Sequence, residues 1–434
     1  MTLDKIYIVL PLDCSPMGID LYKLKTTTEV HTLITTHVTT INALFHGLSG
    51  FIGPQWAAAA GMVMSPRLRR EHCVPGRPEN LGENARKAAT LGFPYSYGTL
   101  EEAIADSFAK HRLGIIALPN HLHEESAVAM LQAGMHVACD KPLAHTRDSA
   151  LRMAQSAKRF LSGGTRTAVL PTYCTFPALL EAEHRIACDR HRILGGRFTY
   201  DQGWLKKPLA QMSPGSGGKQ AGWRKDAMLS GTGGALGDIF SHIIFQLWFL
   251  TGQKVVAVKR ANRRFVIDGK LVKKPGGSEV VGTDDECFAV LVLEQGAEIH
   301  CHAVQYADSK RNDNGWQLWT DGPTYQWNMD HHPEILRIGD RQIAGEAFAA
   351  PIIGATRTMP AFHGQGWTEA AARMLQWFAW EITNEYPQGV RPFPFDFLLG
   401  LNVQHVIEAV IESAESDGKD ADVRWINGWD DLPL

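Results

Sequence analysis

Residues 139–143, Cys-Asp-Lys-Pro-Leu, join a short apolar run to a helical segment, and the rest of the chain is organised around them. The apolar run, 135–138, is typical of a buried strand, and a helix is expected from Thr146. Pro142 disfavours helical dihedral angles at Lys141, so the lysine should lie extended at the carboxyl end of that strand. Open α/β sheets bind ligands at this edge. Lys141 is therefore a candidate catalytic residue, although these residues alone favour a surface lysine at a strand end.

Strands and helices alternate on both sides of this stretch. The expected strands are 41–45, 113–118, 135–139 and 167–173, and the expected helices are 55–60, 101–111, 124–133 and 146–160. This alternation predicts an α/β fold with a parallel sheet and right-handed crossovers. After residue 176, consecutive strands separated by turns predict a large open, mostly antiparallel sheet with helices on one face. The predicted domains are an irregular extension (1–40), a Rossmann domain (41–176) and an α+β domain (177–434).

A glycine-rich turn follows the first expected strand and precedes an alanine-rich helix. Such a turn aims backbone N–H groups and a positive helix end at a pyrophosphate, so it is a candidate cofactor loop. Its spacing, G-x-x-G-x-x-G, differs from G-x-G-x-x-G and is a weak signal alone. The residues expected to contact a cofactor there are Gly47, Ser49, Gly50, Phe51, Ile52 and Gly53.

The segment after the glycine turn is expected to be shortened, with the helix and the second strand compressed into 53–64. No Asp or Glu occurs in 30–70, so the carboxylate that would bind an adenosine ribose is missing. Ser65 and Arg67 are expected where the strand ends. They indicate either a solvated basic loop or a pocket for the 2′-phosphate of NADP.

A second polar cluster begins about a hundred residues after Lys141. Asp238 and His242 stand four residues apart in 233–242, near the start of an apolar helix, and should share one helix face. A helix cap and a core histidine are the alternative interpretation. The loop after the strand 113–118 adds Pro119, Asn120 and His123 at the same sheet edge as Lys141.

Composition excludes several classes of function. The 434 residues carry a net charge of −3, which gives no basic field for nucleic acid or for an anionic membrane. No apolar run reaches the roughly 18–20 residues that span a bilayer. The seven cysteines are dispersed without a C-x-x-C pair, so neither a disulfide framework nor a zinc site is expected. We expect a cytoplasmic enzyme without a metal site.

Several ordered blocks resemble the Gfo/Idh/MocA family of NAD(P)-dependent sugar and inositol dehydrogenases, from about Phe45 to the carboxyl end. The matching blocks are 49–53, 119–123, 139–143, 223–226, 233–242 and 359–364. The resemblance implies NAD or NADP as cofactor and a sugar or cyclic polyol as substrate. It also implies a homodimer or homotetramer formed through the open sheet.

The resemblance further implies roles for single residues. Lys141 would be the catalytic lysine and would also contact the cofactor, with Asp238 and His242 beside it. His242 titrates near neutrality and suits proton transfer from an alcohol, and Asp238 would orient the imidazole or bind a neighbouring hydroxyl. Further substrate contacts would come from Tyr173, Trp223, Arg224 and His363.

Two other functions are compatible with the sequence. The first is a non-catalytic sugar- or nucleotide-binding protein whose Rossmann end has decayed, which the shortened segment after Gly53 would explain. The second is an enzyme that retains its nucleotide and uses transient oxidation to process a glycoside. The intact set of Lys141, Asp238 and His242 favours a dehydrogenase.

Overall fold

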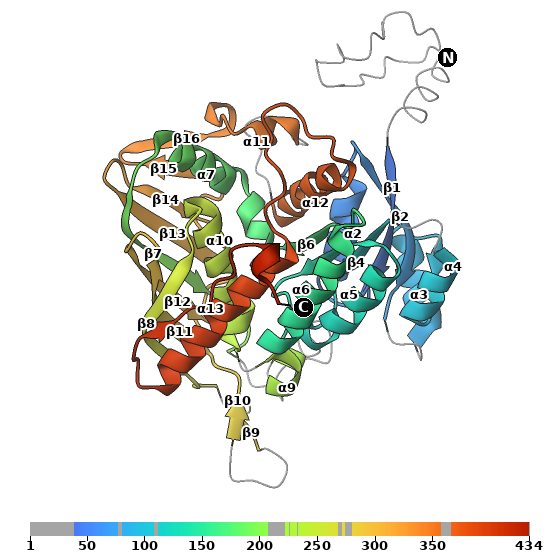
Figure 1. Cartoon of the computed structure of the whole chain (residues 1–434), viewed down its shortest axis with the longest axis horizontal. Coiled ribbons are helices and arrows are strands. Elements are labelled where there is room, and N and C mark those ends of the chain that lie inside the picture. The colour runs from blue at the N-terminus through green and yellow to red at the C-terminus, as the bar shows by residue number, and fades with distance from the viewer. Residues whose placement is uncertain are drawn as a thin grey trace, which may run out of the picture. The chain divides into compact units, whose positions relative to one another are not determined.

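The structure is a computed structural model that describes residues 39–76, 80–107, 112–206, 222–224, 226–231, 233–267, 271–273, 280–356 and 366–433. The predicted irregular extension, 1–40, lies outside these residues except for its last two. Two sheets dominate the described chain and confirm the predicted fold class (Figure 1).

The first sheet is parallel and has the strand order β3-β2-β1-β4-β5-β6. Its strands are β1 (Thr40–His46), β2 (Arg67–Val74), β3 (Tyr95–Ser96), β4 (Leu113–Ile116), β5 (His136–Asp140) and β6 (Thr167–Leu170). The order reverses between β1 and β4, which is the point where a doubly wound sheet binds a dinucleotide. All of β4, and β5 up to Cys139, is buried, as expected for strands covered on both faces.

Right-handed crossovers place the helices on opposite faces of this sheet. On one face α2 (Gly53–Gly61) packs against α12 (Trp367–Thr383), and on the other α5 (His123–Gln132) and α13 (Phe397–Glu415) both contact α6 (Arg147–Leu161) (Figure 1). Thr146 caps α6, as its side chain accepts a hydrogen bond from the Ser149 N–H at 3.2 Å. Two shorter helices, α3 (Leu81–Thr90) and α4 (Leu100–Ser107), flank β3 in the chain.

The second sheet has nine strands in the order β16-β15-β14-β13-β7-β12-β11-β8-β17. Each pair is antiparallel except β12 with β7. The strands are β7 (Ile193–Asp201), β8 (Val255–Arg264), β11 (Glu286–Leu293), β12 (Glu298–Val304), β13 (Asp313–Thr320), β14 (Tyr325–Asn328), β15 (Ile335–Ile338), β16 (Arg341–Ala344) and β17 (Ala421–Asp422). A separate two-stranded sheet pairs β9 (Leu271–Lys273) with β10 (Val280–Gly282).

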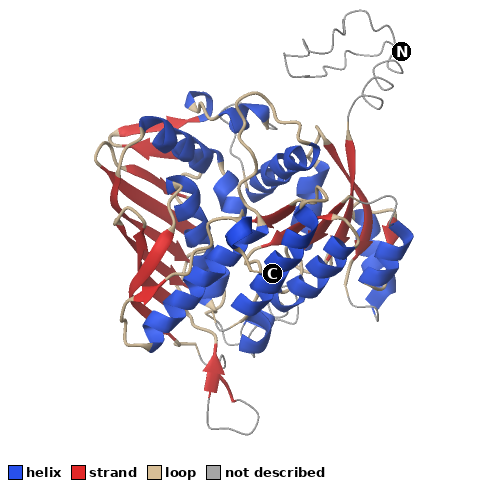
Figure 2. Ribbon diagram, in the orientation of Figure 1, coloured by secondary structure: helices blue, strands red, loops and turns tan. Residues whose placement is uncertain are grey.

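The helices that pack against the nine-stranded sheet lie on one side of it (Figure 2). They are α7 (Pro177–Asp189), α10 (Ser241–Thr251) and α13. Inward residues such as Phe198 and Trp316 are buried, whereas Arg197 and Trp319, on the other parity, are exposed. The sheet therefore has one covered face and one open face, as the sequence predicted.

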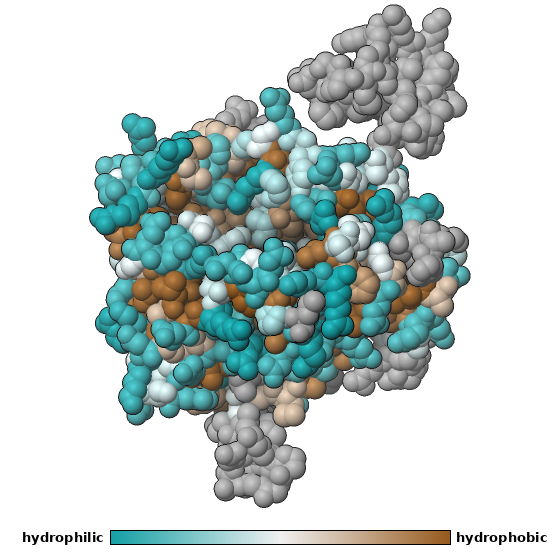
Figure 3. Space-filling model, in the orientation of Figure 1, coloured by the Kyte–Doolittle hydropathy of each residue, from teal (hydrophilic) through white to brown (hydrophobic). Residues whose placement is uncertain are grey.

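Hydrophilic side chains separate the apolar patches of the described residues on the face shown in Figure 3. Within the described parts of the chain, every helix is too short or too polar to cross a bilayer.

The segment after Gly53 is not shortened, and that expectation was wrong. The helix α2 ends at Gly61, and β2 starts at Arg67 and runs for eight residues. The sequence prediction placed the second strand before residue 65, whereas residues 62–66 form the turn that leads into it. The arginines at 67 and 69 face solvent and alternate with buried Leu68 along β2. The βαβ unit is therefore complete.

Candidate active site

The turn between β1 and α2 is too tight for side chains at two of its glycines. Gly47 has a φ of +107°, and a Cβ there would lie 2.5 Å from the carbonyl oxygen of Ala117. A Cβ on Gly53 would collide with the carbonyl oxygen of Gly47. Ser49, Gly50, Phe51 and Ile52 lie in the same turn, whose Gly47 N–H donates to the Val74 carbonyl at 3.0 Å. This bare backbone cradle before α2 fits a dinucleotide pyrophosphate.

Replacing Gly53 with alanine should weaken NADH binding at least about tenfold and lower the free energy of unfolding by about 1–3 kcal/mol, because the turn must shift to admit the methyl group. Titration calorimetry and urea unfolding measure the two effects. Gly82→Ala is the matched control, since a Cβ on Gly82 in α3 meets open space. Equal affinities for Gly53→Ala and the unmodified protein would contradict the cradle.

Ser65 and Arg67 do not lie with the other predicted cofactor residues, so their placement at the end of the second strand was wrong. β2 begins at Arg67 and runs parallel to β1, and the pair His46 and Val74 marks the edge with the glycine turn. Ser65 precedes the opposite end, where its carbonyl accepts hydrogen bonds from Gln376 and Trp380 of α12. A contact with a cofactor bound at the glycine turn is therefore not supported.

The loop after β4 leads to His123, which contacts both this loop and the loop that carries Lys141. Pro119 precedes a short 3₁₀ turn (Asn120–Leu122), in which Asn120 is buried. His123, fully buried, has Nε2 2.9 Å from the Leu118 carbonyl oxygen and Nδ1 3.2 Å from the Pro142 carbonyl oxygen. Burial lowers the pKa of His123, so its ring is neutral at pH 7. The neutral ring has a single N–H and donates to only one of these oxygens, so His123 packs between the two strand ends and binds one of them.

Lys141 directly follows β5 and reaches across to the second half of the chain. Its peptide bond to Pro142 is cis. Its Nζ donates to the carbonyl oxygen of Asp238 at 2.7 Å and to the carboxylate Oδ1 of Asp238 at 3.4 Å. Burial raises the pKa of the neighbouring Asp140 to about 6, against the opposing effect of the Lys141 charge. An ammonium group with three N–H bonds retains a donor for a ligand after these two contacts.

Asp238 is the centre of the ionic cluster. It lies in a π-helical turn (Leu236–Phe240) that leads into α10, and such turns are frequent at functional sites. Its carboxylate also accepts hydrogen bonds from Arg224 Nε at 3.1 Å and Gln305 Nε2 at 3.3 Å. Burial alone would raise the pKa of Asp238, but the charges of Arg224 and Lys141 outweigh it and hold the pKa well below its usual range. Asp238 is therefore ionised at neutral pH.

His242, one helical turn later, is neutral and is not oriented by Asp238, contrary to expectation. No hydrogen bond joins the two side chains in the described structure; instead the Tyr173 ring packs edge-on against the imidazole, with centroids 4.6 Å apart. Among the described residues His242 Nδ1, a buried atom, has no hydrogen-bond partner. Burial, followed by the Lys141 charge, lowers the pKa of His242 well below 6.5. The neutral ring can accept a proton but holds it weakly.

Buried histidines should make the protein less stable in acid. His46 and His136 have pKa values of about 4 because of burial, and that of His242 is lowered as well. Such a group binds fewer protons when folded, so unfolding becomes easier as the pH falls below 6.5. One pKa unit corresponds to about 1.4 kcal/mol, so we expect a loss of several kcal/mol between pH 7 and pH 4. Urea unfolding at pH 7, 5.5 and 4.5 measures it, and a constant value would contradict the prediction.

Arg224 and Trp223 meet at the rim of this cluster. The guanidinium carbon of Arg224 lies 4.3 Å from the ring centroid of Trp223 and 5.7 Å from that of Trp204, within the range of cation–π interactions. The sixth substrate candidate, His363, lies outside the described residues. The structure therefore brings together Lys141, Asp238, His242, Tyr173, Arg224 and Trp223.

Sequence reasoning missed further polar residues of this cluster. Gln305 follows β12 and binds Asp238. Tyr200, near the end of β7, and Gln202, directly after β7, are two positions apart. Residues two apart on a strand share a face, and this period was the available signal. Asn312, which precedes β13, gave no signal of its own.

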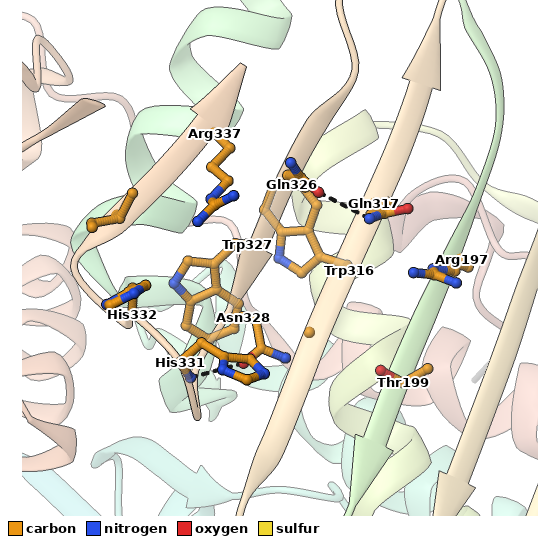
Figure 4. Close-up of a pocket in the computed structure, with 12 residues that line it drawn as sticks. Arg197, Thr199, Trp316, Gln317, Gln326, Trp327, Asn328, His331, His332 and Arg337 are labelled. Atoms are coloured by element: carbon orange, nitrogen blue, oxygen red, sulfur yellow. Dashed lines mark hydrogen bonds between the residues drawn. The ribbon is translucent and has the colours of Figure 1, made fainter. Parts of the chain in front are cut away.

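One hollow among the described residues lies away from this cluster. It measures about 350 Å³, lies on the nine-stranded sheet and is lined by none of the predicted site residues (Figure 4). We place the candidate active site at Lys141 because acid–base groups with strongly shifted pKa values converge there.

Comparisons with known proteins give the class first. An oxidoreductase-family domain with an NAD-binding Rossmann fold matches residues 47–160, and a GFO/IDH/MocA C-terminal domain matches residues 192–322. Levoglucosan dehydrogenase of Pseudarthrobacter phenanthrenivorans is 30% identical over 306 residues, which are 66% of this chain and 73% of that protein. The chain belongs to the Gfo/Idh/MocA oxidoreductase family, as the sequence motifs indicated.

Solved structures agree with this assignment. A structure of levoglucosan dehydrogenase with NADH and levoglucosan has a TM-score of 0.74 and 27% identity, over 89% of this chain and all of that one. An inositol dehydrogenase homologue from Azotobacter vinelandii, in complex with NAD⁺, has a TM-score of 0.76 over 88% of this chain and 97% of its own. At 19% identity, the second structure supports the fold alone.

Proposed function

We propose that this protein is an NAD(P)-dependent dehydrogenase that transfers a hydride between a nicotinamide cofactor and a secondary alcohol of a sugar or cyclic polyol. One observation carries the proposal: the Lys141 ammonium from the Rossmann sheet edge is bonded to Asp238 in the other half of the chain, beside a neutral His242. Oxidation of an alcohol requires a group that stabilises the alkoxide and a group that takes its proton.

The residues divide this work between them. Lys141 keeps one N–H for the substrate oxygen, and Asp238 and its carbonyl hold the ammonium in place. His242 accepts the hydroxyl proton, and its low pKa favours passing that proton on. A nicotinamide cofactor bound at this site would supply the hydride-acceptor chemistry. Gly47 to Gly53 would hold the pyrophosphate of that cofactor, with Asn120 and Lys141 nearer the nicotinamide end.

The choice between NAD and NADP depends on the end of β2. Described residues there are Val74, Pro75 and Gly76, none of which offers a carboxylate to a ribose hydroxyl. The Lys87 ammonium lies close by and donates to the Ser49 carbonyl at 3.3 Å. We therefore propose that both dinucleotides bind, and titration calorimetry with NADH and NADPH compares them.

The test of the proposed function is the absorbance of reduced nicotinamide, with NAD and with NADP, against levoglucosan, myo-inositol and a panel of aldoses. We expect turnover with at least one of these alcohols. The named relatives support the panel, since levoglucosan dehydrogenase and glucose-6-phosphate 3-dehydrogenase of Bacillus subtilis are similar to this chain. Cofactor binding without turnover of any alcohol would overturn the proposal.

The two alternatives now stand differently. The non-catalytic alternative was based on a shortened Rossmann end, and the complete β2 removes that basis. Glycoside processing with a retained nucleotide keeps the same site, and it would show as cofactor that co-purifies and gives no net NADH.

The proposal also includes a homodimer or homotetramer formed through the open face of the nine-stranded sheet. A cross-strand row of Arg197, Gln317, Gln326 and Arg337 lines the hollow on this sheet (Figure 4). Beside this row the Trp319 indole covers Gly195 and stays 40% exposed. An exposed indole next to guanidinium groups has the composition of an interface.

Trp319→Lys should shift the mass measured by light scattering toward that of a monomer, because it places a charge in the proposed interface. Met64→Lys is the control, since Met64 is also an exposed apolar residue (63%) but lies beside the Rossmann sheet. A monomeric unmodified protein, or an unchanged oligomer in Trp319→Lys, would contradict this part of the proposal.

A cytoplasmic location and a domain boundary at residue 176 complete the proposal. The six described cysteines are free thiols, which suits a reducing compartment.

A further inference from the structure

A chain of hydrogen bonds leads from the protein surface to the tyrosine beside His242. Trp204 Nε1 donates to Gln202 Oε1 at 3.1 Å, and Gln202 Nε2 donates to Asn312 Oδ1 at 2.6 Å. The Tyr200 hydroxyl donates to the same Asn312 oxygen at 3.0 Å. The hydroxyls of Tyr200 and Tyr173 are 2.7 Å apart.

The indole of Trp204 fixes the direction of every bond in this chain, because an indole N–H can only donate. Gln202 must therefore present its oxygen to Trp204 and its amide nitrogen to Asn312. Asn312 in turn must present its oxygen, since two donors face it. The single proton of Tyr200 is then used on Asn312, and the oxygen of Tyr200 is left to accept.

It follows that Tyr173 is the donor in the contact between the two tyrosines. Its own proton is committed to Tyr200, so its phenolic oxygen has only lone pairs to offer. The ring of Tyr173 touches His242, and the Asp238 charge contributes to its raised pKa of about 12, which burial causes first. Tyr173 thus stays a neutral phenol beside the reacting groups.

We propose that this chain makes Tyr173 an obligatory hydrogen-bond acceptor, which selects substrates that present a hydroxyl donor next to the reacting carbon. The inference rests on the proposed function and adds a specificity determinant to it. Trp204, Gln202, Asn312 and Tyr200 act through Tyr173 and are positioning residues. A substrate with a carbonyl or a fluorine at the same place would leave the phenolic oxygen of Tyr173 without a donor, which is unfavourable in a buried site.

The proton positions can be observed without any substrate. Neutron diffraction from deuterated crystals should show the Tyr173 deuteron pointing at Tyr200 and the Tyr200 deuteron pointing at Asn312. A Tyr173 deuteron directed at His242 or Asp238 would overturn the inference whatever the enzyme oxidises.

Selection is measured by the binding of levoglucosan and its monodeoxyfluoro analogues to the NADH complex. Fluorine replaces a hydroxyl at nearly the same size but cannot donate. At one ring position the fluoro analogue should bind the unmodified protein at least about tenfold more weakly than levoglucosan. Tyr200→Phe frees the Tyr173 proton and should shrink this ratio toward one.

Tyr325→Phe is the matched control. Tyr325 is a buried tyrosine of the same sheet, and its hydroxyl donates to Asp189, which is not part of the hydrogen-bond chain from Trp204 to Tyr173. Its ratio should equal that of the unmodified protein. Trp204→Phe, at the partly exposed end of the hydrogen-bond chain, should also lower the affinity ratio. It provides a second test in case Tyr200→Phe does not fold. A ratio unchanged in both chain variants would overturn the inference. If levoglucosan does not bind, the same ratio is measured with a panel alcohol that is turned over and its fluoro analogues, and the neutron result tests the hydrogen-bond directions independently.

Discussion

Lys141→Ala should lower kcat by about 10³-fold while leaving the affinity for NADH within about threefold of the unmodified protein. In the proposed mechanism the lysine supplies the donor to the substrate oxygen, and its removal leaves the glycine cradle untouched, since Gly47 and Gly53 are fixed by other backbone contacts. Stopped-flow absorbance of reduced nicotinamide gives kcat, and titration calorimetry gives the affinity.

Loss of the Lys141 ammonium also leaves Asp238 with one cation fewer, so a structural effect must be separated from a catalytic one. Lys141→Arg keeps a positive charge beside Asp238 but changes the shape of the hydrogen-bond donor. Compared with Lys141→Ala, it should restore stability without restoring full turnover. Full turnover in Lys141→Ala would remove the lysine from the mechanism.

Asp238→Asn should lower kcat by at least about 10²-fold and reduce the free energy of unfolding by roughly 3 kcal/mol. The amide keeps the shape but removes the charge that balances Lys141 and Arg224, both largely buried. The Lys141 ammonium then loses its charged partner and its fixed position.

The sign of the pH effect offers a second check on Asp238. Its pKa is held below the usual carboxyl range in the folded protein, so its stabilising contribution is present above pH 4 and is lost as the pH falls further. The unmodified protein should lose this contribution in acid, and Asp238→Asn should not. Asp308→Asn, at an exposed ion pair with Lys206, should change neither stability nor turnover. An Asp238→Asn variant as stable as the Asp308→Asn control would contradict the central role of the cluster.

Much of the Rossmann sheet could be predicted because β1, β4, β5 and β6 are short, mainly apolar runs. The expected strand 135–139 corresponds to β5 (His136–Asp140), and the helix predicted from Thr146 begins at Arg147 with that threonine as its cap. β2 was missed because its sequence, Arg-Leu-Arg-Arg-Glu-His-Cys-Val, is mostly charged at its start and becomes apolar only at its last two residues. The alternation of exposed and buried positions over residues 67–69 was the available clue to this strand.

The candidate site could be predicted in its members but not in its connections. The motif spacing identified Lys141, Asp238 and His242, yet Asp238 pairs with Lys141 and Arg224 instead of the histidine. A spacing of four places two side chains on one helix face only if the helix is regular, and the π-helical turn at Asp238 changes that relation. Side-chain contacts between residues a hundred positions apart depend on packing, which a single sequence does not show.

His123 has a consequence for anyone who wishes to redesign this enzyme. Its imidazole lies between the loop that ends β4 and the loop that carries the lysine, and its polar contacts are with main-chain oxygens. The contacts of His123 therefore do not depend on which substrate is bound. Mutant libraries designed for new alcohols should keep His123 unchanged. They should vary Trp223 and Arg224 at the rim of the site, where substitutions change the shape of the pocket without displacing the loop that carries Lys141.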